Sequence, residues 1–328
     1  MKIGTIGSGV IVLQFLEACQ KVEGVELVGA YSRSLETALT IAKTVNMPLT
    51  FTDLNVMLGS TEIDTVYIAS PNSLHYEQAK AALNAGKHAI VEKPFCSHNR
   101  EAEELIQLAQ KNNCFIFEAM SINFMPNLVE LKHRMHEIEP IKWVELSMCQ
   151  YSSKFDAFKK GELPNVFNPE FSGGALMDLN IYHYNFILEL FGKAESEHYE
   201  VMHAANGIDV GGVILMRYPN LMVTALATKD AVGRPMGTLH GEKGMIEFTE
   251  GVNGLRSFTL TQAKVSEKIN IQSEDNRLFY EVLAFETMIK NKDKDAMLRL
   301  ANKTIERLEG LTHLRKAAHI QFAADSKA

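Results

Sequence analysis

The sequence predicts an α/β protein that starts with a doubly wound parallel sheet and continues into an α/β domain with a large open, mostly antiparallel sheet. Up to about residue 118, short β-rich runs alternate with longer amphipathic stretches, as in βα units. After about residue 120, strands follow one another through short turns, which indicates antiparallel pairing. The chain has 328 residues, more than one compact domain usually holds. We therefore expect a first domain with the parallel sheet at 1–120 and a second domain at 121–328, with the last helix a candidate to pack back on the first.

The first half contains strands and helices in regular alternation. The helix after Pro71 is the clearest, because Asn72 or Ser73 is a plausible N-cap and Gly86 a stop signal. The expected strands are KIGTI, VELVGAY, TVYIAS, HAIVE and CFIFEA, and the expected helices cover residues 10–22, 35–45, 74–85 and 99–112. This order implies parallel strands with helices on both faces of the sheet.

The second half opens with an expected helix from Pro126 to Glu137 and closes with two helices over 276–290 and 296–318. HGEKGMIEF is predicted to be a hairpin, because Gly241 and Gly244 bracket its turn. The expected strands are WVELSMCQY, SEHYEVMHA, VGGVILMRY, LMVTALAT, GTLHG and GMIEF. Strands joined so closely favour a largely antiparallel sheet.

Composition and charge exclude several classes of protein. The net charge is -7 with Lys and Arg scattered, so neither nucleic acid nor an anionic membrane is an expected partner. The four cysteines lack C-x-x-C spacing, which favours a reducing cytoplasm over disulfides or a zinc site. Residues 3–16 are interrupted by glycines and lack a cleavage site, which argues against a signal peptide, and no apolar run reaches transmembrane length. We expect a cytoplasmic protein that acts on a small molecule and requires no metal.

GSGVIV, directly after the first strand, reads Gly7-x-Gly9-x-x-Val12. In a dinucleotide site the first glycine permits a tight turn and the second lets the backbone approach a pyrophosphate at the helix N-terminus. Val12 stands where a third Gly or Ala is usual, so the helix and strand are expected to lie slightly further apart. A glycine-rich turn without a ligand is the alternative. We predict that Gly7, Gly9, Val10 and Ile11 bind a dinucleotide.

The second strand ends in GAYSRS, without the acidic residue that binds the ribose 2′-hydroxyl of NAD. Ser32 and Arg33 offer a hydroxyl and a guanidinium group that suit a 2′-phosphate. This favours NADP over NAD as the cofactor. Alternatively, Arg33 lies in solvent or stacks on adenine, where it would serve either cofactor.

Polar residues also follow the third strand, at the edge where a doubly wound sheet binds its ligand. Ser70, Asn72 and His75 are candidates to contact the cofactor or the substrate. Asparagine is equally favourable as a helix cap, so Asn72 has a purely structural alternative.

Glu92 and Lys93 come at the carboxyl end of the fourth strand, HAIVE, and Pro94 follows them. A Glu-Lys pair in a loop is usually solvated. Here the apolar strand and the ligand-binding edge favour a functional interpretation, and Pro94 restricts Lys93 to extended conformations. We expect Lys93 to hold its ammonium group in one direction. Glu92 either fixes Lys93 or contacts the cofactor ribose.

Residues 172–192, SGGALMDLNIYHYNFILELFG, are predicted to form a helix that ends at Gly192. At about 100° per residue, its polar and apolar side chains fall on separate stripes. The polar stripe comprises Asp178, Tyr182, Asn185 and Glu189. His183 falls on the apolar stripe, which favours a core histidine over an acid or base. Tyr182 has a proton to give at neutral pH, whereas the structural alternative for its stripe is a solvated helix face.

GTIGSG, SPNSLHYEQAKAAL followed by GKHAIVEKP, and GGALMDLNIYHY together resemble the glucose-fructose oxidoreductase / inositol dehydrogenase / MocA family. Their order and spacing match over nearly the whole chain, and GEKGMIEF resembles the Gly-x-Lys-Gly hairpin of the family. The resemblance implies a Rossmann domain, a second domain whose exposed sheet face commonly forms homodimers or homotetramers, and NAD(P)-dependent oxidation or reduction of a sugar, cyclitol or related alcohol.

The resemblance also implies roles for individual residues. In such enzymes the lysine of Glu-Lys-Pro, here Lys93, hydrogen-bonds the reacting oxygen, and an Asp and a His four residues later complete the site. Those two positions are Asp178 and Tyr182 in this sequence, and His183 lies one residue further. The branch that resembles dihydrodiol dehydrogenase and some xylose dehydrogenases carries a tyrosine there.

One segment departs from that branch, which tends to show Met-Trp-x-Arg-Phe-x-Pro. In EAMSINFMP, Ser121 and Asn123 replace the tryptophan and the arginine. An aromatic wall and a fixed cation are therefore expected to be missing from the pocket.

The expected function is an NADP-preferring oxidoreductase that moves hydride between the nicotinamide and a carbonyl or secondary alcohol of a sugar, cyclitol or diol. Lys93 is expected to polarise the oxygen, Tyr182 to exchange the proton and Asp178 to support both. The alternatives are a dinucleotide-binding sensor without catalysis and a reductase of a non-sugar ketone or imine. The presence of all three side chains favours chemistry.

Overall fold

The computed structural model describes residues 1–326 and divides by its internal contacts into two units. The first unit holds Met1–Ser121, close to the predicted range of 1–120. It also includes Asn276–Leu308. The second unit holds Ile122–Asp275 and the residues from Glu309 onward. The helix α10 (Lys294–Ala317) contributes residues to both units.

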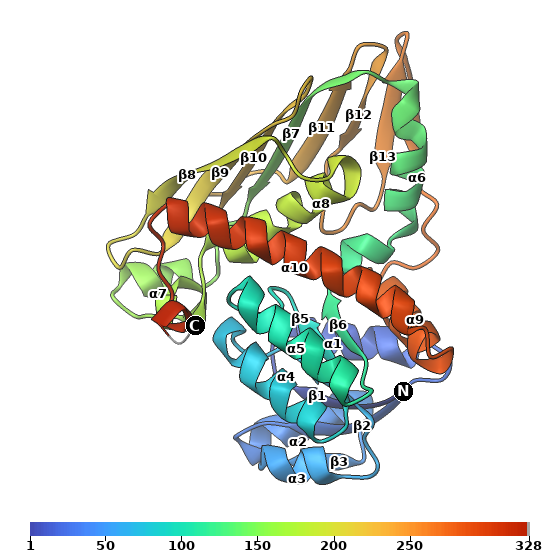
Figure 1. The fold of residues 1–328 in the computed structure, drawn as a ribbon, viewed down its shortest axis with the longest axis vertical. Coiled ribbons are helices and arrows are strands. Elements are labelled where there is room, and N and C mark those ends of the chain that lie inside the picture. Colours follow the sequence, from blue (N-terminus) through green and yellow to red (C-terminus); the bar gives the residue numbers. More distant parts are fainter. Residues whose placement is uncertain (327–328) are drawn as a thin grey trace. The chain divides into compact units, whose positions relative to one another are not determined.

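The first unit contains a six-stranded parallel sheet in the order β3-β2-β1-β4-β5-β6 (Figure 1). Its strands are β1 (Lys2–Ile6), β2 (Glu26–Tyr31), β3 (Leu49–Phe51), β4 (Thr65–Ile68), β5 (His88–Glu92) and β6 (Ile116–Ala119). The order reverses between β1 and β4, which is the switch point where such sheets bind ligands. The expected doubly wound parallel sheet is confirmed.

Helices cover both faces of this sheet (Figure 1). They are α1 (Val10–Gln20), α2 (Leu35–Val45), α3 (Leu54–Gly59), α4 (His75–Asn84), α5 (Asn99–Lys111) and α9 (Phe279–Lys290). The central strands are therefore apolar on both sides: Ala89, Ile90 and Val91 of β5 are all 0% exposed. Burial of each branched side chain contributes about 1.5–3 kcal/mol, which fixes the strand that leads to Lys93.

The second unit contains an eight-stranded sheet in the order β14-β13-β12-β11-β7-β10-β9-β8 (Figure 1). All neighbours are antiparallel except β7 and β10. The strands are β7 (Ile141–Cys149), β8 (Ser196–His203), β9 (Asp209–Arg217), β10 (Met222–Thr228), β11 (Met236–Gly241), β12 (Gly244–Phe248), β13 (Phe258–Gln262) and β14 (Val265–Ile269). This confirms the predicted large, mostly antiparallel sheet and the hairpin between β11 and β12.

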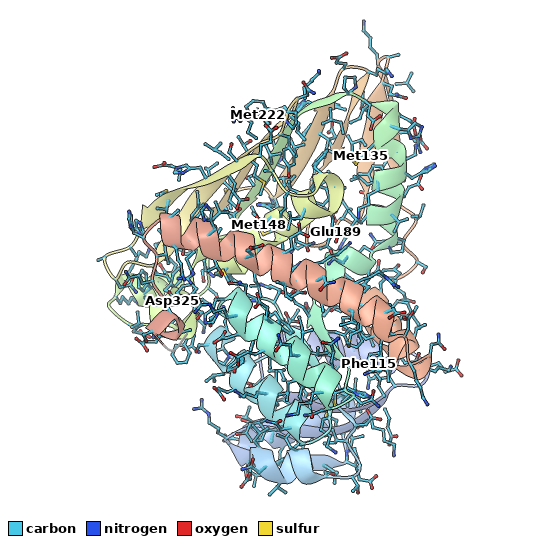
Figure 2. The ribbon with its side chains drawn as sticks, in the orientation of Figure 1. Phe115, Met135, Met148, Glu189, Met222 and Asp325 are labelled. Atoms are coloured by element: carbon cyan, nitrogen blue, oxygen red, sulfur yellow. The ribbon has the colours of Figure 1, made fainter. Side chains whose placement is uncertain are left out.

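The remaining helices of the second unit are α6 (Pro126–Arg134), α7 (Phe155–Lys159) and α8 (Ile181–Phe191). The sheet has a buried face and a more exposed face because its side chains alternate along each strand. Met148 of β7 lies on the buried face at 4% exposure, whereas Met222 of β10 lies on the other (Figure 2). Within residues 1–326, no helix is long and apolar enough to cross a membrane.

Candidate active site

The loop between β1 and α1 has the geometry that a dinucleotide requires. Gly7 has a φ of +120°, and a Cβ there would overlap the carbonyl group of Ala69 at the end of β4. A Cβ on Gly9, the N-cap of α1, would instead point into open space. The first glycine thus allows the two strand ends to approach, and the second leaves room beside a helix N-terminus. Both features fit a pyrophosphate, with Val10 and Ile11 as the first residues of the helix.

The segment after β2 lies at the neighbouring strand end and presents hydroxyl groups and a cation. Ser34 caps α2 by accepting a hydrogen bond from the Thr37 backbone N–H at 3.4 Å, and Ser32 Oγ accepts one from the Ser34 N–H at 3.3 Å. Arg33 between them is exposed. The loop therefore holds Arg33 outward without an acidic residue beside it, as a 2′-phosphate site requires.

His75 joins the ends of β4 and β5. Its ring nitrogens lie 2.9 Å from the carbonyl oxygen of Pro94 and 2.8 Å from that of Ser70, and burial lowers its pKa. Asn72 opens a short 3₁₀ turn (Asn72–Leu74), so it does not occupy the N-cap of α4, which is Leu74. His75 thus fixes the backbone around Lys93, and its contact with the cofactor stays a prediction.

Glu92 holds the end of β5 next to Lys93 through hydrogen bonds. Tyr67 on β4 donates its hydroxyl to Glu92 Oε1 at 2.7 Å, and the Lys93 backbone N–H donates to Glu92 Oε2 at 3.2 Å. The Tyr67 ring in turn stacks on Phe15 of α1, with centroids 3.7 Å apart. The peptide bond between Lys93 and Pro94 is cis. A chain of contacts therefore runs from α1 to Lys93, and Glu92 is its central member.

A buried ionic network holds the chain directly after Pro94. Phe95 donates its backbone N–H to Glu118 Oε1 at 3.2 Å, and Glu118 is paired with the buried Arg307 of α10. Thr304 donates its hydroxyl to Glu118 at 2.8 Å. Because both charges are buried, loss of one partner would leave the other uncompensated. This network anchors the position of Lys93 from the opposite side.

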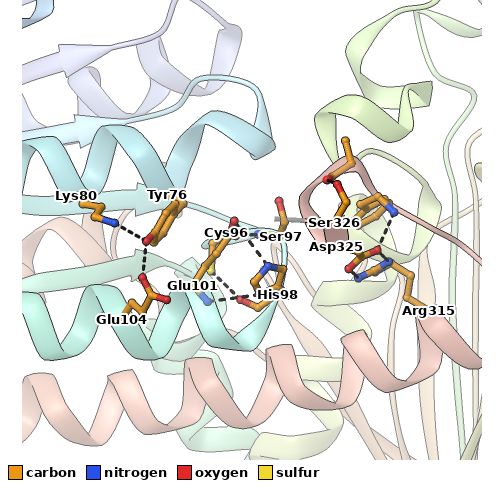
Figure 3. A network of polar contacts seen from close by, with 12 residues as sticks. Tyr76, Lys80, Cys96, Ser97, His98, Glu101, Glu104, Arg315, Asp325 and Ser326 are labelled. Carbon is orange, nitrogen blue, oxygen red and sulfur yellow. Dashed lines mark hydrogen bonds and ion pairs between the residues drawn. The ribbon is translucent and has the colours of Figure 1, made fainter. Parts of the chain in front are cut away.

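Further hydrogen bonds secure this loop and its neighbouring helices (Figure 3). Ser97 donates its backbone N–H to Glu101 Oε2 at 2.8 Å, and His98 caps α5. Within α4, Lys80 donates to the Tyr76 hydroxyl at 2.8 Å, and Tyr76 in turn donates to Glu104 of α5. The residues that follow Glu-Lys-Pro are therefore tied to α5.

Glu281 of α9 is a second carboxyl group near Glu92. It is 0% exposed, and neither carboxyl oxygen has a hydrogen-bond partner among the described residues. Burial and the charge of Glu92 raise its pKa well above 4.5, whereas Arg277 opposes the shift. Cys19 and Tyr67 also face it, and their own pKa values are raised by burial with a smaller contribution from Glu281. Burial therefore favours the neutral form of the Glu281 carboxyl group.

Replacement of Glu281 by Gln is expected to make the protein more stable than the wild type as the pH rises. A raised folded pKa means that stability is fully present below the unfolded value near 4.5 and is lost as the pH rises towards the folded pKa. The amide cannot ionise, so the difference in unfolding midpoint between Glu281→Gln and wild type should grow from pH 5 to pH 8, measured by thermal unfolding. A constant difference across this range would show that Glu281 is already ionised.

The helix that contains Asp178 and Tyr182 begins where two consecutive glycines pack closely and Asp209 accepts a backbone hydrogen bond. Asp209 Oδ2 accepts hydrogen bonds from the Leu176 backbone N–H at 2.6 Å and from the Tyr199 hydroxyl at 2.9 Å. Gly174 has a φ of +102°, and a Cβ there would overlap this carboxylate. Gly173 packs similarly against backbone, with a Cβ 2.7 Å from the Val166 oxygen. Gly174 is thus required by the close approach of Asp209 at the start of β9, and Gly173 by the close approach of the 3₁₀ turn Asn165–Phe167.

Gly174→Ala is expected to destabilise the protein by about 2 kcal/mol or more, because alanine is strained at this φ and displaces the Asp209 cap. Urea unfolding measures this loss. Gly59→Ala is the control, since a Cβ on Gly59 meets nothing within 4 Å. Equal stability of the two variants would contradict the proposed close packing.

The helix after the glycines differs from the regular helix predicted over 172–192. It begins with a π-helical turn, Leu176–Asn180, and continues as α8 (Ile181–Phe191). Such turns are rare in proteins as a whole, but those that occur are often found at functional sites. Asp178 lies on the π turn and is one third exposed, whereas Tyr182 follows at 6% exposure. The wider turn alters the angle between them, so regular spacing alone does not place these two residues.

The rest of the predicted polar stripe is paired, with Asn185 buried and the side chain of Glu189 only 7% exposed. Asn185 donates to Asn123 Oδ1 at 2.7 Å, and Glu189 accepts from Lys132 at 2.6 Å (Figure 2). The alternative of a solvated helix face is therefore wrong. His183 is 0% exposed, its Nδ1 lies 2.9 Å from Asn180 Oδ1, and burial lowers its pKa to about 3. It is a neutral core histidine, as its apolar stripe predicts.

Two paired cations, Arg277 and Lys229, were not identified from the sequence. Arg277, just before α9, donates to the Ser121 hydroxyl, and its charge acts on Glu92. Lys229, directly after β10, is 3% exposed and donates to Asp178. The sequence contained a signal for Lys229: like Lys93, it is a charged residue directly after an apolar strand.

The chain matches two family models. The model described as an oxidoreductase family with an NAD-binding Rossmann fold matches residues 1–120, and the GFO/IDH/MocA C-terminal domain matches residues 136–247. Together they cover most of the chain.

Named relatives agree with this match. The chain is 33% identical over 325 residues to scyllo-inositol 2-dehydrogenase (NADP(+)) IolU of Bacillus subtilis, covering 99% of both chains. It is 25% identical over 252 residues to trans-1,2-dihydrobenzene-1,2-diol dehydrogenase of Xenopus laevis, covering 75% of this chain and 74% of the relative.

A solved structure shares the fold. The structure of KijD10, a 3-ketoreductase from Actinomadura kijaniata, in complex with NADP and TDP-benzene matches with a TM-score of 0.83 at 17% identity, covering 96% of each chain. The comparisons confirm the predicted NAD(P)-dependent oxidoreductase, and the relatives named here are dehydrogenases of alcohols. This chain belongs to the Gfo/Idh/MocA family of oxidoreductases with an NAD-binding Rossmann fold.

Proposed function

We propose that this protein is an NADP-preferring dehydrogenase that interconverts a secondary alcohol and a ketone on a cyclitol, sugar or diol, with a cyclitol as the first substrate to test. The observation that carries the proposal is the fixed position of Lys93 at the carboxyl end of β5. Glu92 accepts from its backbone, and Glu118 holds the backbone two residues later. An ammonium group held at the ligand-binding edge is suited to polarise an oxygen atom.

The cofactor-binding residues that we propose fit NADP. Gly7, Gly9, Val10 and Ile11 receive the pyrophosphate at the start of α1, and Ser32 and Arg33 receive the 2′-phosphate. Ser70, Asn72, His75, Glu92 and Lys93 complete the set at the ends of β4 and β5. The bound nicotinamide supplies the chemistry of hydride transfer.

Each proposed catalytic residue has one task. Lys93 hydrogen-bonds the reacting oxygen and stabilises the negative charge that develops on it. Tyr182 gives a proton to that oxygen during reduction and takes it back during oxidation. Asp178 accepts a hydrogen bond from the substrate and orients it.

A substrate panel tests the proposal. Purified protein is incubated with NADP⁺ or NAD⁺ and with scyllo-inositol, D-xylose or trans-1,2-dihydrobenzene-1,2-diol, the compounds named for relatives. We expect reduction of NADP⁺ with scyllo-inositol, at a kcat/KM at least about tenfold above that with NAD⁺, since loss of a charged hydrogen bond costs about 1.5–3 kcal/mol. Cofactor binding without turnover of any alcohol would favour a sensor instead.

We also propose that the protein is a cytoplasmic homodimer or homotetramer that associates through the exposed face of its large sheet. The register places four large apolar side chains on that face, each 37–44% exposed. They are Trp143, Leu215, Leu226 and Met236. All four cysteines are free, as in a reducing compartment. Sedimentation analysis of the wild type and Trp143→Glu measures the association.

A further inference from the structure

Lys229 is a buried ammonium group whose backbone is fixed on both sides. Its N–H donates to Val210 O at 2.7 Å, and its carbonyl oxygen accepts from the Ser152 N–H at 2.8 Å. Its side chain is 4% exposed and forms an ion pair with Asp178, whose side chain is 33% exposed. The geometry therefore buries the cation and leaves part of the carboxylate accessible.

Other groups enclose the same ammonium. The ring of Phe167, which is 0% exposed, has its centroid 5.4 Å from Nζ. The charge of Lys229 also acts on the buried Asp209, where it opposes the rise in pKa that burial causes. Lys229 thus links the carboxylate that starts the Gly-Gly helix with the carboxylate on its π turn.

Stability alone does not account for a lysine at this buried position. Removal of an ammonium group from water costs several kcal/mol, and a buried ion pair often stabilises a fold no better than apolar side chains of the same volume. Lys229 instead directs one oxygen of Asp178, and the 33% exposure of this side chain lets a ligand approach the acceptor-only group. Substrate hydroxyl groups are donors that suit it, whereas phosphate or carboxylate groups are repelled.

We propose that Lys229 is a positioning residue that fixes Asp178 as a hydrogen-bond acceptor and thereby restricts the substrate to uncharged polyhydroxy compounds. This inference rests on the function proposed above. It adds a residue to the site and a substrate class, neutral polyols in preference to sugar acids and sugar phosphates.

Kinetics of Lys229→Met, Lys229→Arg and Asp178→Asn test the inference with scyllo-inositol and an inositol monophosphate. A misplaced Asp178 is expected to lower kcat/KM of Lys229→Met for the neutral substrate by about 10- to 100-fold. The acid limb of its pH profile should move to higher pH, because the carboxylate loses its cation. Lys229→Arg should recover part of the rate that Lys229→Met loses. In Asp178→Asn, the ratio of kcat/KM for scyllo-inositol to that for the inositol monophosphate should be smaller than in the wild type.

The double variant Lys229→Met/Asp178→Asn is the control for misfolding. It removes both charges of the pair, so neither charge remains without its partner. NADPH binding, followed by fluorescence, reports an intact first unit in every variant. The inference is overturned if Lys229→Met keeps the wild-type rate and pH profile, or if the wild type accepts the phosphate as readily as the neutral polyol. Absence of turnover by the wild type on every alcohol would overturn the proposed function and the inference with it.

Discussion

Lys93→Met is expected to lower kcat by about 10²- to 10⁴-fold, because the reacting oxygen loses the donor that stabilises its developing charge. NADPH affinity should fall far less than kcat, since the glycine loop and the segment after β2 are unchanged. The two quantities are measured by steady-state turnover and by NADPH fluorescence titration. A loss of kcat much larger than the loss of cofactor affinity identifies Lys93 as a catalytic residue.

Lys80→Met is the matched control for this variant. Lys80 also belongs to the first unit and donates to Tyr76 at 2.8 Å, but it lies on α4 rather than at a strand end. Its replacement should leave kcat within about threefold of the wild type, as surface substitutions usually change little. Equal turnover by Lys93→Met and wild type would refute the assigned role of Lys93.

Tyr182→Phe is expected to lower kcat by about 10²- to 10³-fold with little change in KM, because it removes one transferable proton and leaves the ring in place. Steady-state kinetics of the variant and the wild type measure kcat and KM separately.

Tyr184→Phe is the control on the same helix. Tyr184 donates its hydroxyl to Glu197 at 2.8 Å, so its loss is expected to cost about 1 kcal/mol of stability without a comparable loss of kcat. If both variants lose stability and activity alike, the tyrosines serve the fold and the proton comes from another group.

The fold was predictable because its signals are local. The strands of the first unit are apolar on both faces and end in motifs of fixed spacing. The sequence therefore predicted correctly that Gly7, Gly9 and Lys93 follow the carboxyl ends of parallel strands in one sheet. β14 was not predicted, because its first four residues are exposed and an edge strand of this kind shows no alternation. The short β3 gave no clear signal either, since none of its three residues is fully buried.

The site was only partly predictable because its remaining parts depend on contacts between distant residues. The π turn before α8 forms where Asp209 meets the Leu176 backbone, and no helical periodicity contains that contact. The pairing of Lys229 with Asp178 likewise joins a strand end to a helix that comes 51 residues earlier. Glu281 lies in the helix predicted over 276–290, and only the structure shows that it is buried and that burial raises its pKa.

Transfer of deuterium from NADPH labelled at C4 of the nicotinamide tests the central claim most directly. The protein is incubated with the ketone of the best alcohol in the panel and each of the two C4-deuterated forms of NADPH. The account predicts that one form delivers a single deuterium atom to the carbon that becomes CH–OH, as read by mass spectrometry, and that Lys93→Met delivers it far more slowly. Product that carries no deuterium from either form would contradict direct hydride transfer by this protein.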